Sequence, residues 1–166
     1  MRKQLKPQYG CEIECYIKGI TSEINRIEGD MAIGVYIYLH TKDNGIYKSI
    51  ELHTISEYFY PNESHSENKA QFEALIACLA WLNENGYTDK RIKIITDLKL
   101  LIDIMTGIFE IGMGRYVNSA KEAFEILPYF TNLKFCWVSS KYNEFAYNLA
   151  KKARIKAINN SIIDSI

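Results

Sequence analysis

The side chains that could carry out nucleophilic or phosphate chemistry are scattered along this 166-residue chain. His40, His53 and His65 fall in predicted strands and a loop, and no Ser or Cys occupies a nucleophile turn beside them, so a catalytic triad is not predicted. Gly112 and Gly114 form a short G-x-G that lacks a third glycine and a preceding strand. That pattern favours a flexible loop over a phosphate cradle.

The four cysteines form no C-x-x-C pair. Cys11 and Cys15 lie about 13 Å apart along a predicted strand, too far for a disulfide. Cys78 and Cys136 fall in apolar helix and strand contexts, which favours buried thiols over zinc ligands. These features predict a reducing, cytoplasmic location.

Acidic and basic residues balance at 20 each, so no global field attracts nucleic acid, although a local patch can still do so. A basic cluster near the C-terminal end is typical of a solvated helix face, with phosphate contact as the alternative; it comprises Lys151, Lys152, Arg154 and Lys156. No apolar run approaches the roughly 18 residues of a membrane span, and the basic start precedes no signal-peptide core. No membrane partner is expected.

One segment carries a recognisable pattern, FCWVSSKYNEFAYNLAKKA, from Phe135 to Ala153. It resembles the last strand, loop and helix of type 1 ribonuclease H, where the family reads approximately W-V-x-x-x-x-N-x-x-A-D-x-L-A. The matching residues are Trp137, Val138, Asn143, Ala146, Leu149 and Ala150. Tyr147 stands where the family has a metal-binding aspartate.

Three further segments follow the same family in the same order. IKIITD-LKLLIDIMTG, residues 92–107, places Asp97 on the family's second catalytic aspartate, and NKAQFEAL, residues 68–75, places Gln71 on its glutamate. CYIKGIT, residues 15–21, places Lys18 on the first aspartate. The resemblance covers about residues 11–154 and implies a catalytically degenerate member of the family.

The chemistry of that family explains why these substitutions matter. Its hydrolysis uses two divalent ions held by carboxylates, which both ligate and neutralise them. Here Lys18, Gln71, Asp97 and Tyr147 sum to about zero charge at neutral pH. We therefore expect no catalytic residue and no metal or other cofactor at these positions. We also predict a Lys18–Asp97 ion pair in place of magnesium, with an attraction of roughly 4 kcal/mol at ~4 Å before desolvation.

A rebuilt site holding Mg²⁺ or Mn²⁺ is the competing interpretation. Glu73 lies about 200° around a helix from Gln71, so it should point elsewhere, and Asp103 fits a solvated helix face. Glu144 is three residues before Tyr147 and is the best alternative ligand.

The predicted elements give an α/β fold with one domain over residues 11–158 and terminal extensions at 1–10 and 159–166. Strands are predicted at 11–18, 31–40, 46–58, 92–97 and 133–138, and helices at 67–85, 98–106, 120–130 and 143–158. A hairpin turn is expected at Asp43, Asn44 and Gly45, and an N-cap at Ser66. The resemblance implies the ribonuclease H-like mixed five-stranded sheet, three antiparallel strands followed by two parallel ones, with helices on both faces.

Three functions remain open at this point. The first is a non-catalytic module that binds an RNA–DNA hybrid or double-stranded nucleic acid, with loop groups making the contacts; these groups are Asn68, Ser140, Lys141 and Asn143. The second is a structural or protein-interaction subunit of a nucleic-acid-processing assembly. The third is a divergent metal-dependent ribonuclease that uses Asp97. Residues 159–166 are expected to fray or pack on the chain itself, with docking of Ile162, Ile163 and Ile166 on a protein partner as the alternative.

Overall fold

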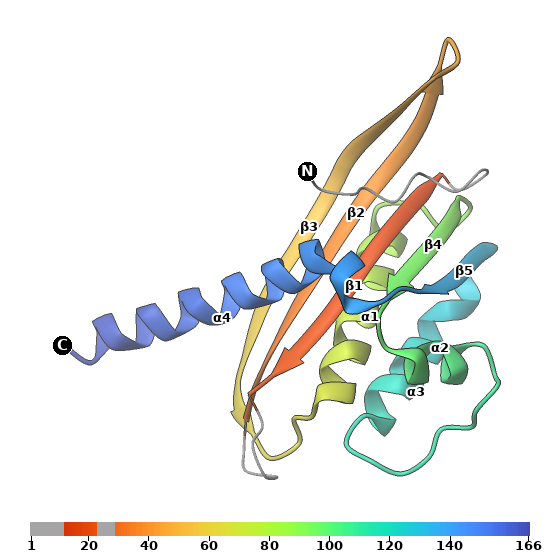
Figure 1. The fold of residues 1–166 in the computed structure, drawn as a ribbon. Coiled ribbons are helices and arrows are strands. Elements are labelled where there is room, and N and C mark those ends of the chain that lie inside the picture. The colour runs from red at the N-terminus through yellow and green to blue at the C-terminus, as the bar shows by residue number, and fades with distance from the viewer. Residues whose placement is uncertain (1–11, 23–28) are drawn as a thin grey trace.

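The computed structural model describes residues 12–22 and 29–166, so the N-terminal extension at 1–10 and Cys11 lie outside the described residues. Five strands form one mixed sheet in the order β3-β2-β1-β4-β5 (Figure 1). The strands are β1 Ile13–Thr21, β2 Gly29–Asp43, β3 Ile46–Asn62, β4 Arg91–Thr96 and β5 Asn132–Trp137. Strands β1, β2 and β3 are antiparallel, whereas β4 runs parallel to β1 and β5 parallel to β4. The predicted mixed five-stranded sheet is confirmed.

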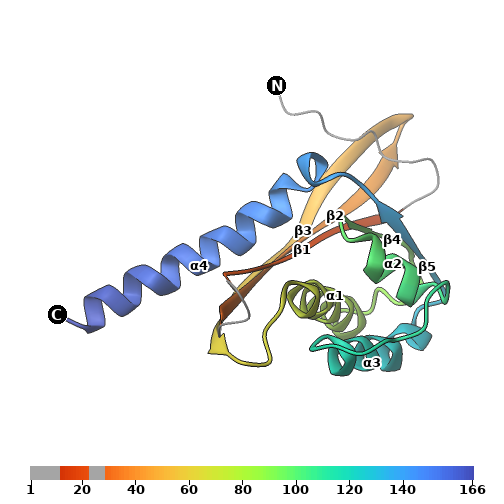
Figure 2. The same ribbon diagram turned by 60° about the horizontal axis from the view of Figure 1, so that its bottom comes forward.

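Helices cover both faces of this sheet, as predicted. They are α1 Glu67–Glu84, α2 Lys99–Met105, α3 Val117–Ile126 and α4 Glu144–Asp164, with short 3-10 helices at Leu127–Tyr129 and Ser140–Tyr142. Helices α1 and α3 lie on one side of the sheet, and α4 crosses the other (Figure 2). Among the described residues, no helix is both long and apolar enough to cross a bilayer.

Alternation along β1 explains why two layers form on its two faces. Ile13, Cys15 and Ile17 are fully buried and join the main core, which also contains α1 residues such as Phe72 and Leu75. The intervening Tyr16 belongs to a second cluster with Ala146 of α4. Successive side chains of a strand point to opposite faces, so one strand contributes to both cores. Cys15 and Cys78 are buried free thiols, as predicted.

Two glycines set the distance between the sheet and its helices. A Cβ on Gly19 of β1 would overlap the backbone of Ala70 and Gln71 in α1. A Cβ on Gly34 of β2 would overlap the Ala146 carbonyl oxygen and lie 2.8 Å from the Ala150 nitrogen of α4. Only glycine lets the two backbones approach this closely. Both helices therefore rest on the sheet at backbone contact.

The predicted turn and cap chemistry is confirmed. Ser66 Oγ accepts a hydrogen bond from the Lys69 N–H at 3.1 Å, which satisfies one free donor at the start of α1. Asn44 and Gly45 both have positive φ, at 48° and 81°, as a tight hairpin turn requires.

Some boundaries differ from the prediction. Strand β1 is shifted to Ile13–Thr21, β3 extends to Asn62, and α3 begins at Val117 and ends at Ile126. The prediction for residues 159–166 was wrong, because α4 continues to Asp164 with its last turns exposed. This stretch contains neither Gly nor Pro, so nothing in the backbone stops the helix where contact with the sheet ends.

A partly buried ion pair joins α4 to the start of β2. The Arg154 guanidinium donates from Nη2 to Asp30 Oδ1 at 2.7 Å and from Nε to Asp30 Oδ2 at 3.0 Å. Burial alone would raise the pKa of Asp30, but hydrogen bonds from Ser22 and Arg154 and the Arg154 charge hold it below its ordinary value. Both carboxylate oxygens are thus satisfied in the ionised state.

Removing this carboxylate should destabilise the protein in a pH-dependent way. Asp30→Asn is expected to lower the free energy of unfolding by about 1–2 kcal/mol at neutral pH, because it leaves Arg154 without its charged partner. The pKa of Asp30 is lower in the folded than in the unfolded protein. The stability difference between the unchanged chain and Asp30→Asn should therefore persist above about pH 4. It should disappear as the pH falls through the pKa of Asp30 in the folded protein. Urea unfolding between pH 7 and pH 2 measures it.

The exposed Asp89 provides the matched control for that measurement. Asp89→Asn should leave the free energy of unfolding nearly unchanged at every pH. An Asp30→Asn effect that stayed constant down to pH 2 would contradict an electrostatic origin.

Candidate functional site

Lys18 and Asp97 meet at the carboxyl ends of two neighbouring parallel strands. Tyr16 of β1 is paired with Ile95 of β4, so the residues two positions further on lie side by side. Lys18 Nζ donates to Asp97 Oδ2 at 2.8 Å and to Oδ1 at 3.0 Å. The two side chains are only 14% and 6% exposed. The predicted ion pair is confirmed.

Gln71 completes this arrangement from α1, where the close contact at Gly19 brings the helix against β1. Its Oε1 accepts a hydrogen bond from the Gly19 N–H at 3.0 Å, and its Nε2 lies 3.5 Å from Asp97 Oδ1. The residue is 1% exposed. The Gln71 amide therefore contacts groups inside the fold: its oxygen faces the Gly19 backbone and its nitrogen faces the Asp97 carboxylate.

Two residues of the segment at 135–153 donate hydrogen bonds to backbone carbonyls of β1 and at the end of β4. The indole Nε1 of Trp137 donates to the Asp97 carbonyl oxygen at 3.2 Å. Asn143 Nδ2 donates to the Ile17 carbonyl oxygen at 2.8 Å, and this residue is fully buried. Its Oδ1 is buried without a hydrogen-bond partner among the described residues. Asn143, predicted as a nucleic-acid contact, thus lies inside and joins the loop before α4 to β1.

Tyr147 lies in the first turns of α4, where its N–H donates to the Asn143 carbonyl oxygen at 3.1 Å. Its side chain is 42% exposed. Within residues 12–22 and 29–166, its hydroxyl forms no hydrogen bond with Lys18, Gln71 or Asp97. The structure thus brings three of the four predicted positions into direct contact and leaves Tyr147 at the solvent side.

The donor set at this site does not suit a divalent cation. Its one carboxylate, Asp97, already accepts two hydrogen bonds from an ammonium group, and a positive charge at hydrogen-bond distance repels a metal ion. Over the described part of the chain, no three His, Cys, Asp or Glu side chains are grouped as metal ligands would be. The residues present do not fit the two-metal chemistry of the resembled family.

The alternative acids lie in other surroundings. Glu73 accepts a hydrogen bond from Ser119 Oγ at 2.7 Å, which directs it towards α3. Asp103 is buried in α2 rather than solvated as expected, and Glu144 is exposed in the first turn of α4.

The segments that adjoin the site residues along the chain carry polar and aromatic groups. Asn68 is half-buried in the first turn of α1, and Ser140 and Lys141 are exposed in the short helix after β5. Lys141 Nζ lies 4.9 Å from the centre of the Tyr142 ring. Trp137 is 54% exposed and Tyr142 36%. Sequence reasoning missed these two aromatic side chains as surface groups, although the outward position of Trp137 at the end of a strand was a usable signal.

Comparison with known proteins agrees with this fold. A family model described as reverse transcriptase-like matches residues 53–153. No curated protein sequence matches the chain. A ribonuclease H1 isolated from compost by a metagenomic approach, LC11, superimposes with a TM-score of 0.72 and 25% identity, over 89% of this chain and 98% of that one.

Two further structures show the same similarity. LC11 ribonuclease H1 in complex with an RNA/DNA hybrid gives a TM-score of 0.65 and 26% identity, over 88% of this chain and 99% of that one. Ribonuclease H1 from the halophilic archaeon Halobacterium salinarum gives a TM-score of 0.69 and 23% identity, over 87% of this chain and 98% of that one. The chain therefore belongs to the reverse transcriptase-like family and has the ribonuclease H fold.

Proposed function

We propose that this protein is a non-catalytic module that binds RNA–DNA hybrid or double-stranded nucleic acid. The observation that carries the proposal is the Lys18–Asp97 ion pair, with an Nζ–Oδ2 distance of 2.8 Å, at the strand ends where the resembled family holds its metal ions. The binding half of the proposal is supported by the similarity to a ribonuclease H1 that was solved with an RNA/DNA hybrid.

Loss of hydrolysis follows from charge. Phosphodiester cleavage in this fold requires metal ions to activate water and to stabilise the leaving oxygen. An ammonium group can attract a phosphate, but it supplies neither a metal-bound hydroxide nor a pair of Lewis acids. Lys18 also neutralises the one remaining carboxylate, so a cation gains little by entering. The site is therefore suited to contact with phosphate rather than to hydrolysis.

The surface of the segments that adjoin the site residues along the chain provides groups for backbone recognition. Lys141 supplies a positive charge, and Asn68 and Ser140 supply hydrogen-bond donors and acceptors that suit phosphate and 2′-hydroxyl groups. The exposed Trp137 and Tyr142 rings add area on which a sugar or an unpaired base can rest. We leave Asn143 out of this surface because it is fully buried.

The test combines cleavage and binding in the same samples. A labelled RNA–DNA hybrid is incubated with Mg²⁺ or Mn²⁺ and with either the unchanged chain or Asp97→Asn. We expect salt-sensitive binding by the unchanged chain and no cleavage by either protein. Lys141→Ala should weaken binding and reduce the slope of log affinity against log salt by about 1, because one phosphate contact is lost. The exposed Lys121 on α3 offers a control, since Lys121→Ala should leave the affinity and its salt slope unchanged.

The other outcomes are decisive against the proposal. Cleavage that disappears in Asp97→Asn would establish the divergent ribonuclease. Absence of both binding and cleavage would favour a structural or protein-interaction subunit. That second candidate is favoured by the balanced charge of the chain and by the exposed isoleucines of α4, which are 45–67% exposed.

A further inference from the structure

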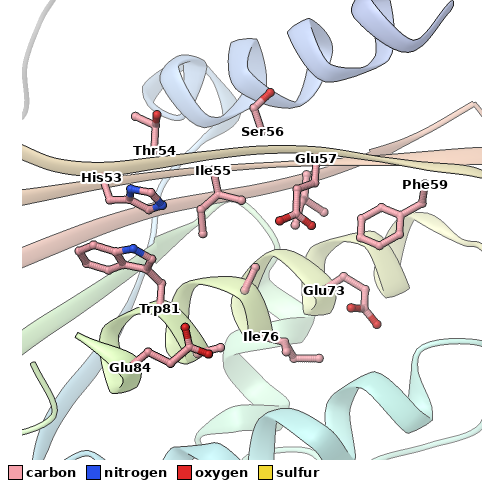
Figure 3. Close-up of a pocket in the computed structure, with 13 residues that line it drawn as sticks. His53, Thr54, Ile55, Ser56, Glu57, Phe59, Glu73, Ile76, Trp81 and Glu84 are labelled. Carbon is pink, nitrogen blue, oxygen red and sulfur yellow. The ribbon is translucent and has the colours of Figure 1, made fainter. Parts of the chain in front are cut away.

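A groove of about 550 Å³ lies between the edge strand β3 and helix α1, away from the Lys18–Asp97 pair. Strand alternation produces its upper wall, because His53, Ile55, Glu57 and Phe59 point towards α1, whereas Thr54 and Ser56 point to the opposite face (Figure 3). The floor is apolar and includes Ile76 of α1. This edge of the sheet therefore carries a hollow that no described element fills.

The groove is acidic. Glu57 on β3 and Glu73 and Glu84 on α1 line it, and no Lys or Arg is among its described lining residues. Glu73 is bonded to Ser119, but Glu57 and Glu84 form no ion pair within the described part of the chain. At the Glu84 end, Trp81 stacks on His53 with ring centres 4.6 Å apart. The groove thus presents unpaired negative charge above an apolar and aromatic floor.

Helix α4 presents the complementary chemistry, on the side turned away from its own sheet. Ala146 and Ala150 are fully buried against the sheet. At 100° per residue, three isoleucines of the last turns lie within about 60° of one another, on the opposite side of the helix. They are Ile155, Ile158 and Ile162, with exposed fractions of 48%, 45% and 55%.

Basic residues accompany this isoleucine face. Lys151 lies in line with the isoleucines, and Lys152 and Lys156 border them. All three lysines are exposed, and none forms an ion pair among the residues that the structure describes. Arg154, in contrast, is held by Asp30. The free end of α4 extends past β3 and away from the body of the domain (Figure 1), so it can reach another molecule.

The two surfaces also agree in length. From Lys151 to Ile162 the helix rises about 16 Å, and the α1 wall from Glu73 to Glu84 spans the same 11 steps and the same length. We propose that the isoleucine face of α4 from one copy docks into the acidic β3–α1 groove of a second copy. Each chain carries one helix and one groove, so exchange between two chains satisfies both surfaces in a closed pair.

Reversing charges on the two surfaces tests this contact without nucleic acid, so its result is independent of the proposed binding function. The groove variant is Glu57→Lys with Glu84→Lys, and the helix variant is Lys152→Glu with Lys156→Glu. Sedimentation velocity should show a concentration-dependent dimer for the unchanged chain. Each variant alone should associate at least about tenfold more weakly, because like charges then face each other. An equimolar mixture of both variants should recover the dimer.

Two further variants separate a specific contact from general effects. Lys99→Glu with Lys121→Glu changes two exposed lysines on α2 and α3 and should leave the dimer intact. Ile158→Gln with Ile162→Gln should dissociate it while leaving the unfolding temperature nearly unchanged, because both side chains are exposed.

Several results would overturn the proposal. A monomer at all concentrations would do so, including one whose α4 binds anionic vesicles instead. A groove variant that still forms dimers by itself would assign the contact to α4–α4 pairing or to another surface. Failure of the mixture to recover association would show that the groove and the helix do not contact each other.

Discussion

Lys18→Asp, Gln71→Glu and Tyr147→Asp, introduced together, are expected to create a magnesium site. With Asp97, the triple variant would bring together four carboxylates from the strand ends, α1 and the start of α4, and the local charge would change from about zero to about −4 at neutral pH. Oxygen ligands and excess negative charge are what Mg²⁺ requires. Calorimetric titration should show heat of binding for the triple variant alone.

Thermal unfolding gives a second measure of the same effect. Without metal, the triple variant should be less stable than the unchanged chain, because the carboxylates repel one another and Asp97 has lost its ammonium partner. Added Mg²⁺ should raise its unfolding temperature, because only the folded state binds the ion. The unchanged chain should show no such shift.

Two control variants test whether magnesium binding by the triple variant depends on removing Lys18 and on keeping Asp97. Tyr147→Asp alone keeps Lys18 in place and should bind no magnesium. Adding Asp97→Asn to the triple variant should abolish the gain. If the unchanged chain bound Mg²⁺ as well as the triple variant does, another acid such as Glu144 would complete a site, and the charge argument would be wrong.

Gly34→Ala is expected to be among the most destabilising single substitutions in this protein. The new methyl group would overlap the Ala146 carbonyl oxygen and press on the Ala150 nitrogen. Both are backbone atoms, so no side-chain rotation relieves the overlap, and α4 must move off the sheet. We expect the free energy of unfolding to fall by about 3 kcal/mol, which corresponds to roughly 6–12 °C in unfolding temperature for a chain of this size.

Gly112→Ala is the control, because a Cβ there would lie 3.3 Å from the Tyr116 hydroxyl, the one atom within 4 Å among those that the structure describes. That substitution should change stability by less than about 1 kcal/mol. Equal unfolding temperatures for the two variants would show that α4 does not rest on Gly34 at backbone contact.

The sequence was most informative where local rules determine the structure. The Ser66 cap and the Asn44-Gly45 turn are each dictated by a few neighbouring residues, and the structure confirms them. The Lys18–Asp97 pair was predictable for a different reason. Once the segments were aligned to a known topology, the two residues fell at the ends of adjacent parallel strands.

Other features depend on contacts that no local pattern reveals. Asn143 is polar in a loop segment, which suggested a surface role, but its amide satisfies the Ile17 carbonyl inside the fold. The end of α4 could not be inferred either, since helices commonly stop where burial stops and this one continues without contact. The acidic groove brings together residues of β3 and α1 that are 14 to 31 positions apart in the sequence, and its shape exists only in three dimensions.

The ion pair at the strand ends has one more consequence. An ordinary metal site depends on the free concentration of its ion, and it is emptied when that concentration falls. Lys18 is a counter-ion tethered to the chain, with its ammonium group 2.8 Å from Asp97, and a tethered group has an effective local concentration that does not change with the surroundings. The Lys18 ammonium group is thus a permanent counter-ion of Asp97. The charge balance at the strand ends therefore stays the same whether divalent ions are abundant or scarce.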